Sequence, residues 1–62
     1  MEDAQLEEIA RELAEYLIAS GRFEKESDWF SAELAAELMM EADDRGYENA
    51  TEIADMAVKL YS

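Results

Sequence analysis

Acidic side chains at helical spacing are the residues of this chain that could do chemistry. Four of them share one face when residues 28–45 are placed on a helix, and they form the long acidic row: Glu33, Glu37, Glu41 and Asp44. Three more share one face of a helix over residues 4–20 and form the short acidic row: Glu8, Glu12 and Glu15. Carboxylates in such rows can transfer protons, bind cations or present a line of negative charge to a partner.

These rows lower the stability of the helices that carry them, because like charges at i,i+4 cost roughly 0.2–0.5 kcal/mol per pair. Alternating Glu with Lys at the same positions would have turned this loss into a gain. We therefore interpret the rows as a candidate functional surface. The alternative is that they are the solvated face of an acidic protein.

The elements that position the rows are three helices joined by short links. Apolar residues recur at helical spacing over about 4–20, 28–45 and 50–61, and Gly21 and Gly46 supply natural helix ends. The first helix is expected to bury Leu6, Ile9, Ala10, Leu13, Tyr16 and Leu17. The third is expected to bury Ile53, Met56, Ala57 and Leu60. We predict an all-α fold, a single helical domain over 1–62 arranged as a compact three-helix bundle.

The helix over 28–45 is apolar on both sides of its acidic row, which is typical of a central helix covered from two directions. One side carries Leu34, Ala35, Leu38, Met39 and Ala42. The other carries Trp29, Ala32, Ala36 and Met40. We expect the two other helices to cover both sides, Ser27 or Asp28 to cap this helix, and Phe30 to pack against the preceding link and not in the main core.

Composition limits the classes of partner. The chain has 62 residues, with seventeen acidic residues against five basic ones and a net charge of −12. Such an excess repels nucleic acid and anionic membranes, and it attracts basic surfaces. The sequence has no Cys, no apolar stretch long enough to span a membrane and no basic region typical of a signal peptide, so we expect a cytoplasmic protein.

Catalysis is not expected. The chain has no His and no Cys, so the usual Ser–His and Cys–His arrangements for nucleophilic catalysis cannot form. Two carboxylates could still act as acid and base, but only in a pocket that separates their pKa values, and three short helices leave little room for one. We expect a protein that is not an enzyme and has no cofactor.

Calcium binding is the most specific metal alternative. Aligning Gly46 with the invariant glycine of an EF-hand loop gives four candidate ligands: Glu41, Asp43, Asn49 and Glu52. Against this alternative, Arg45 would occupy a coordinating position, and the loop would begin with a Glu instead of the shorter Asp. Residues 49–52 also have the spacing of a helix-capping box. We therefore predict no metal site.

The charge argues against a helix-turn-helix DNA binder and favours its opposite, a DNA mimic. A recognition helix needs Lys and Arg to neutralise phosphates, whereas the helix over 28–45 has only Arg45 and the helix over 50–61 only Lys59. Acids at i,i+4 stand roughly 6 Å apart, and the long acidic row covers roughly 16 Å, comparable with several phosphates along one strand. Such a domain could fill a basic groove that normally holds DNA.

The small size, the all-helical acidic pattern and the absence of catalytic residues resemble the DNA-mimicking anti-CRISPR proteins of phages and other mobile elements. The resemblance covers the whole chain, and the two acidic rows are the residues that carry it. It implies an inhibitor of a type I CRISPR system, acting inside the bacterial host cell by covering the DNA-binding groove of a Cascade subunit such as Cas8. It implies a protein partner, with no direct contact to nucleic acid or membrane.

A different kind of binding protein is the main alternative. An antitoxin or adaptor could neutralise a basic protein by docking an apolar helix face, for which Trp29, Ala36 and Met40 are suitable residues. A homodimer closed through the same face is also possible. We favour a monomer in which this face is covered by the other helices.

Overall fold

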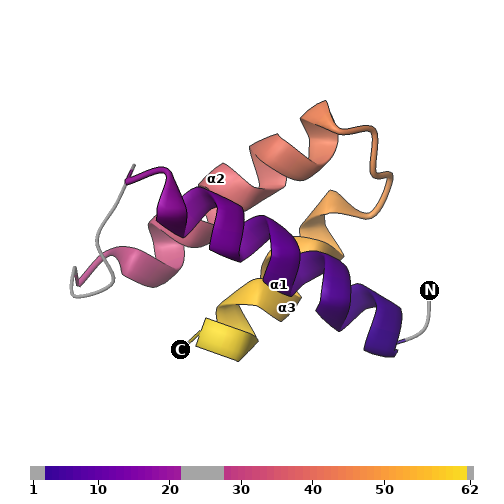
Figure 1. The fold of residues 1–62 in the computed structure, drawn as a ribbon, viewed down its shortest axis with the longest axis horizontal. Helices are drawn as coiled ribbons and strands as arrows, with labels where there is room; N and C mark the ends of the chain where they lie inside the picture. The colour runs from indigo at the N-terminus through magenta and orange to yellow at the C-terminus, as the bar shows by residue number, and fades with distance from the viewer. Residues whose placement is uncertain (1–2, 22–27, 62) are drawn as a thin grey trace.

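The computed structural model describes residues 3–21 and 28–61, which form three helices. They are α1 (Asp3–Ala19), α2 (Phe30–Asp44) and α3 (Ala50–Tyr61) (Figure 1). The predicted all-α three-helix bundle is confirmed, and the helix ends lie within two residues of those expected from periodicity. Differences of this size are usual at helix ends.

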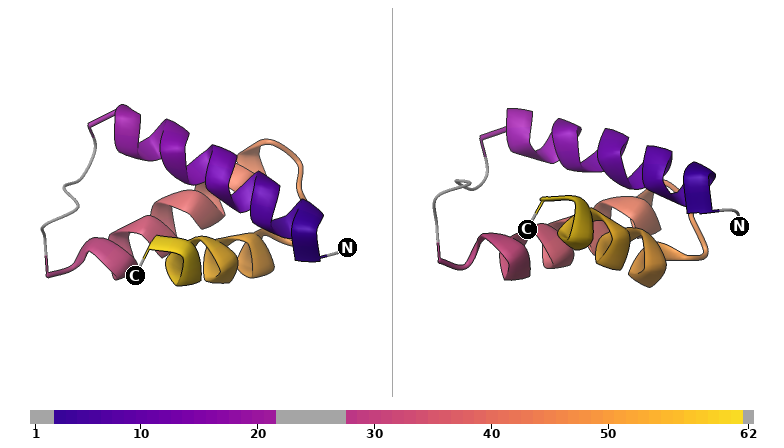
Figure 2. Two further views of the ribbon diagram at one scale, coloured as in Figure 1. Left: turned by 60° about the horizontal axis from the view of Figure 1, so that its bottom comes forward. Right: turned by 90° about the horizontal axis from the view of Figure 1, so that it is seen from below.

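All three helices contact one another, and the contact between α2 and α3 is the most extensive. In Figure 2, α2 and α3 lie side by side as one layer, and α1 lies across that layer. Contact with both other helices does not distinguish α2 as the central helix, because α3 also contacts both and α1 packs more extensively on α3 than on α2. Because α1 and α3 both pack on the same half of α2, its other half is left uncovered.

The core lies where the three helices meet. Its buried apolar residues are Ala10, Leu13, Ala14, Leu17, Phe30, Leu34, Leu38, Ala42, Ile53 and Ala57. Around it pack half-buried side chains from α1 and α3, including Leu6, Ile9, Met56 and Leu60. These are the apolar faces predicted for the two helices, except that Ala14 and Ala54 are also buried and Tyr16 is not. Tyr16 was expected in the core and is 51% exposed.

The start of α2 differs from the prediction. The N-cap residue is Trp29, which makes no capping hydrogen bond through its side chain, so Asp28 does not cap the helix, and Ser27 lies outside the described residues. Phe30 is buried in the core instead of packing only on the preceding link. The physical reason is periodicity: a helix that begins at Phe30 places it four residues before Leu34, at the end of the buried stripe.

The expectation that both apolar sides of α2 would be covered is wrong for one of them. The uncovered side comprises Trp29, Ala32, Ala36 and Met40, and we call it the α2 outer face. All four residues are exposed. The cause lies in the arrangement of the helices, since neither α1 nor α3 reaches around α2 to this side.

The end of α2 is a Schellman motif built on Gly46. The N–H of Gly46 donates to the carbonyl of Asp43 at 3.0 Å, and the N–H of Tyr47 donates to the carbonyl of Ala42 at 3.0 Å. Gly46 has a φ of +89°, which glycine adopts without strain. The Tyr47 side chain then packs against the core, so this turn sets the path of the chain from α2 into α3.

We expect Gly46→Ala to lower the free energy of unfolding by roughly 1 kcal/mol, because an L-residue is strained at positive φ. A Cβ at this position would meet no atom within 4 Å, so the loss comes from the backbone alone. Urea denaturation followed by circular dichroism measures it. An unchanged midpoint would show that the turn has a different conformation.

Candidate functional site

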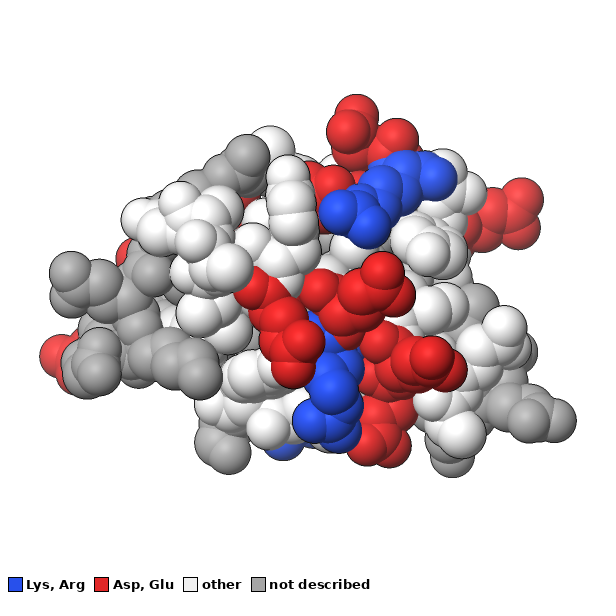
Figure 3. Space-filling view, viewed as in Figure 1, with Lys and Arg blue, Asp and Glu red and all other residues white. Residues whose placement is uncertain are grey.

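The short acidic row lies on the side of α1 that faces away from the core. Leu13, Ala14 and Leu17 point inward and are buried, whereas Glu8, Glu12 and Glu15 are all exposed. Figure 3 shows acidic side chains gathered over α1 in the middle of this face, with a basic side chain between them. The structure therefore confirms that the three carboxylates share one exposed surface.

The long acidic row lies on the flank of α2, next to the buried stripe. Glu33, Glu37 and Glu41 are half-buried and Asp44 is exposed. Each of the three glutamates precedes a buried residue of α2 by one position, so it lies about 100° around the helix from that residue. The row is therefore continuous along the helix but less open to a partner than the row on α1.

Arg45 joins the two rows. Its Nε donates a hydrogen bond to Oε2 of Glu41 at 2.7 Å, and its guanidinium carbon lies 5.1 Å from the centre of the Tyr16 ring on α1. The hydrogen bond to Glu41 raises the pKa of Arg45, and the charges of Glu41, Tyr16 and Glu12 add to this against the opposing effect of desolvation. The rows on α1 and α2 thus approach each other around one guanidinium group.

The sequence alone indicates only one of the contacts that Arg45 makes. The spacing of Glu41 and Arg45 permits an i,i+4 ion pair, but only the fold brings α1 beside it. Tyr16 lies outside the core, and the guanidinium group of Arg45 lies over its ring. The aromatic ring and the cation attract each other in this arrangement.

Most of the carboxylates on α1 keep their charge unpaired within the part of the chain that the structure describes. Arg11 donates to Glu7 at 2.8 Å, and Glu7 belongs to neither acidic row. Among residues 3–21 and 28–61, no ion pair involves Glu8, Glu12 or Glu15. No ion pair among the described residues therefore neutralises the short acidic row, although the charge of Arg45 acts on Glu12.

The structure does not favour the calcium alternative. Among the described residues, no group of three or more acidic side chains is arranged to hold a metal ion. Glu41 is bonded to Arg45, and the carbonyl of Asn49 accepts the N–H of Ile53 at 3.0 Å at the start of α3. The residues proposed as a loop are thus part of two helices and the turn between them.

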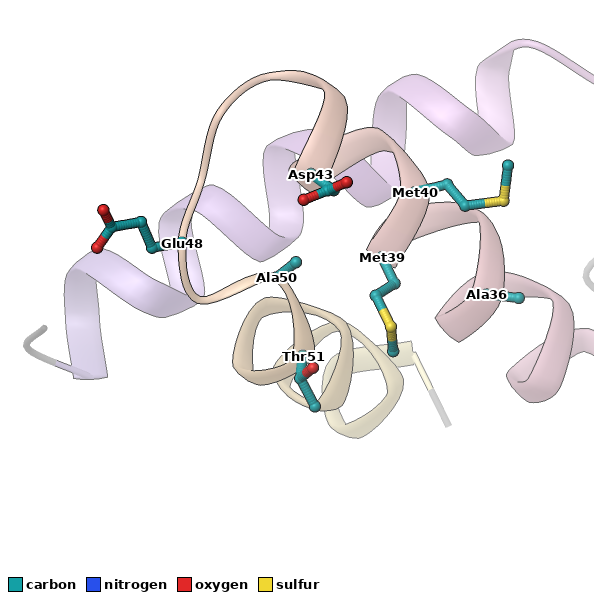
Figure 4. Close-up of a pocket in the computed structure, with 7 residues that line it drawn as sticks. All are labelled: Ala36, Met39, Met40, Asp43, Glu48, Ala50 and Thr51. Atoms are coloured by element: carbon teal, nitrogen blue, oxygen red, sulfur yellow. The ribbon is translucent and has the colours of Figure 1, made fainter.

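A second candidate surface is the α2 outer face. Trp29 is 70% exposed and Met40 is 67% exposed, and the adjacent Met39 is 39% exposed. Beside them, α2 and the start of α3 enclose an open hollow of about 670 Å³, lined by Ala36, Met39, Met40, Asp43, Glu48, Ala50 and Thr51 (Figure 4). Large exposed apolar side chains grouped on one helix are typical of interaction sites.

None of the helices in the described part of the chain is both long and apolar enough to cross a membrane. The chain matches no protein-family model, no curated protein and no solved structure.

Proposed function

We propose that this protein is an acidic DNA mimic, an inhibitor that occupies the positively charged DNA-binding groove of a nucleic-acid-binding protein. The observation that carries the proposal is the junction at Arg45, where Glu12 of the short acidic row and Glu41 of the long acidic row lie near the same guanidinium group. Because both rows stand on helices packed around one core, their spacing is fixed before any partner binds. A preorganised surface loses less entropy on binding than a flexible acidic segment.

The mechanism is electrostatic and needs no catalytic group. A groove that holds DNA is lined with Lys and Arg, and these side chains attract any rigid array of negative charge. The short acidic row extends roughly 10 Å along α1 and the long acidic row roughly 16 Å along α2, which is the scale of several phosphates on one strand. Occupying the groove is sufficient to exclude DNA.

The resemblance to anti-CRISPR proteins gives the first target to test, a type I Cascade subunit such as Cas8. Binding to that target would place the protein in the cytoplasm of a bacterial host cell. We propose that it acts there as a monomer, since the acidic surface is complete within one chain.

A competition assay tests the proposal directly. Labelled double-stranded DNA is bound to purified Cascade, the protein is titrated in, and DNA release is measured between 50 and 200 mM salt, a range over which binding through several phosphate-like contacts weakens by orders of magnitude. We expect release at low salt and a steep loss of inhibition as salt rises. Inhibition that is insensitive to salt would contradict mimicry and favour the antitoxin or adaptor alternative, which binds through an apolar face.

Removing the cation at the junction should strengthen inhibition. Arg45→Gln removes the positive charge between the two rows and keeps a side chain of similar length, so the surface becomes more negative. We expect inhibition of DNA binding to become several-fold stronger at low salt, with the gain lost at high salt. Lys59→Gln is the matched control for net charge, because Lys59 is exposed on α3 and belongs to neither row. A larger gain from Lys59→Gln would place the binding surface elsewhere.

A further inference from the structure

The α2 outer face has the properties of a surface that binds another helix. Its residues lie on the side of α2 opposite the buried stripe, and the face together with the hollow at its end, from Trp29 to Asp43, extends roughly 20 Å along the axis. Ala32 and Ala36 are small, so the backbone of a second helix could approach closely in the middle of the face. Met40 and Trp29 lie toward its ends, and methionine and tryptophan are well suited to filling an apolar contact.

The hollow beside α2 extends this face. In Figure 4, Met39 lies between α2 and the start of α3, close to Thr51, while Met40 and Ala36 point away from that gap. An apolar side chain from a second helix could enter the hollow against Met39 and Ala50. Its volume of about 670 Å³ is ample for one or two such side chains.

Acidic side chains flank the apolar stripe on both sides. Asp43 and Glu48 lie at the hollow between α2 and α3. On the opposite side of Met40, a second, smaller hollow of about 260 Å³ is lined by Glu37, Glu41 and Asp44, of which Glu41 is paired with Arg45. An occupant with Lys or Arg beside its apolar residues would complement both borders.

The same borders argue against a second copy of this chain as the occupant. Two copies packed through α2 would bring their acidic borders together, and each chain has a net charge of −12. Like charges placed across an interface oppose association, so a partner of opposite charge fits this face better than a second copy does.

We propose that the α2 outer face binds an amphipathic helix of about four turns, with apolar residues on one side and Lys or Arg at its edges, presented by a basic protein partner. This inference depends on the proposed function in one respect: both require a partner that carries positive charge. It adds a second contact surface, separate from the short acidic row and outside the DNA-binding groove, so salt still removes the inhibition of DNA binding but not this contact. A partner with both a basic groove and such a helix would be held at two sites.

A synthetic peptide tests this proposal. A sixteen-residue peptide of Leu and Lys patterned as an amphipathic helix, without Trp, is titrated into the protein at 300 mM salt, where simple charge attraction is screened within about 6 Å. Trp29 is the only tryptophan of the chain and lies on the proposed surface, so its fluorescence reports binding. We expect a blue shift that saturates, and none with a peptide of the same composition in scrambled order.

Met40→Glu should weaken peptide binding at least tenfold, although it makes the protein more negative and would strengthen a purely electrostatic contact. Ala4→Glu is the matched control: it adds the same charge at an exposed position of α1, and it should leave the affinity unchanged. Ala36→Glu is the second variant, at the middle of the face, and circular dichroism verifies the fold of each. Equal binding of the scrambled peptide, or unchanged affinity in both α2 variants, would overturn the proposal.

Sedimentation equilibrium of the protein alone tests the remaining alternative, in which a second copy of the chain covers the α2 outer face. A dimer that Met40→Glu dissociates would show that a second copy covers the face, and it would overturn the proposed basic helix.

The peptide assay does not depend on DNA competition. If the proposed function fails, the peptide still binds. If only the further inference fails, salt-sensitive release of DNA persists and the peptide does not bind.

Discussion

Neutralising the short acidic row should nearly abolish inhibition of DNA binding. The triple variant Glu8→Gln, Glu12→Gln, Glu15→Gln removes three exposed charges from the centre of the proposed surface and keeps the length of each side chain. We expect the concentration needed for half-maximal inhibition to rise about 100-fold or more at low salt, because each carboxylate that pairs with a cation of the groove strengthens binding separately. The salt dependence should become shallower by about one unit of slope for each carboxylate that is neutralised.

The fold should tolerate this change. All three side chains point away from the core, and within the described residues none of them forms an ion pair. Removing like charges at i,i+4 and i,i+3 should raise helix stability slightly, by roughly 0.2–0.5 kcal/mol per pair. Thermal unfolding followed by circular dichroism should therefore give a transition temperature equal to or above that of the unmodified chain.

A second triple variant controls for net charge. Glu48→Gln, Glu52→Gln and Asp55→Asn also remove three exposed charges, but from α3 and the turn before it. We expect its inhibition to fall only a few-fold, through the weaker general attraction between opposite net charges. If the two triple variants lose the same amount of inhibition, net charge and not the arrangement of the rows governs binding, and mimicry is contradicted.

The long acidic row calls for a different substitution. The Nε of Arg45 donates a hydrogen bond to Glu41 at 2.7 Å. Glu41→Lys would replace this bond by a repulsion between two cations, and it would disturb the contact of Arg45 with Tyr16 as well as the charge of the row. Glu33→Lys with Asp44→Lys changes the two ends of the row and leaves that bond intact. Reversing Glu33 and Asp44 therefore tests the charge of the row, whereas reversing Glu41 also changes the local structure. The spacing of the carboxylates alone does not reveal this difference.

Helix type, helix ends and most of the core could be predicted from the sequence, because each follows from local patterns. The spacing of Leu13 and Leu17, or of Leu34 and Leu38, identifies a face, and Gly46 identifies an end. The exposure of the short acidic row follows in the same way, since its residues lie opposite the buried face of α1.

What could not be predicted depends on how the helices pack. Helical periodicity shows that α2 has two apolar sides but not which side its neighbours cover, and both neighbours pack on the side of Leu38. The junction of Glu12, Tyr16 and Arg45 joins residues about thirty positions apart, so no local pattern indicates it. Phe30 and Trp29 show this limit: the two adjacent rings point about 100° apart, and only the ring on the side of Leu34 is covered by the neighbouring helices.

Leu38→Ala should unfold most of the protein, whereas Met40→Ala should leave it folded. Leu38 is fully buried where the three helices meet, and replacing a buried Leu by Ala costs about 3–5 kcal/mol. A domain of this length has only about 3–9 kcal/mol of stability in total. Met40 is 67% exposed two residues further along the same helix, so its truncation should change the free energy of unfolding by less than about 0.5 kcal/mol.

Urea denaturation of the two variants decides which face of α2 is covered in solution. Both replace one large apolar residue by Ala, the best helix former, so helix propensity does not favour either result. A large loss for Leu38→Ala with little change for Met40→Ala is the expected outcome. A comparable loss for Met40→Ala would mean that the α2 outer face is buried in solution, either by residues outside the described ranges or by a second molecule. Repeating that measurement at several protein concentrations would distinguish the two, since only an intermolecular contact depends on concentration.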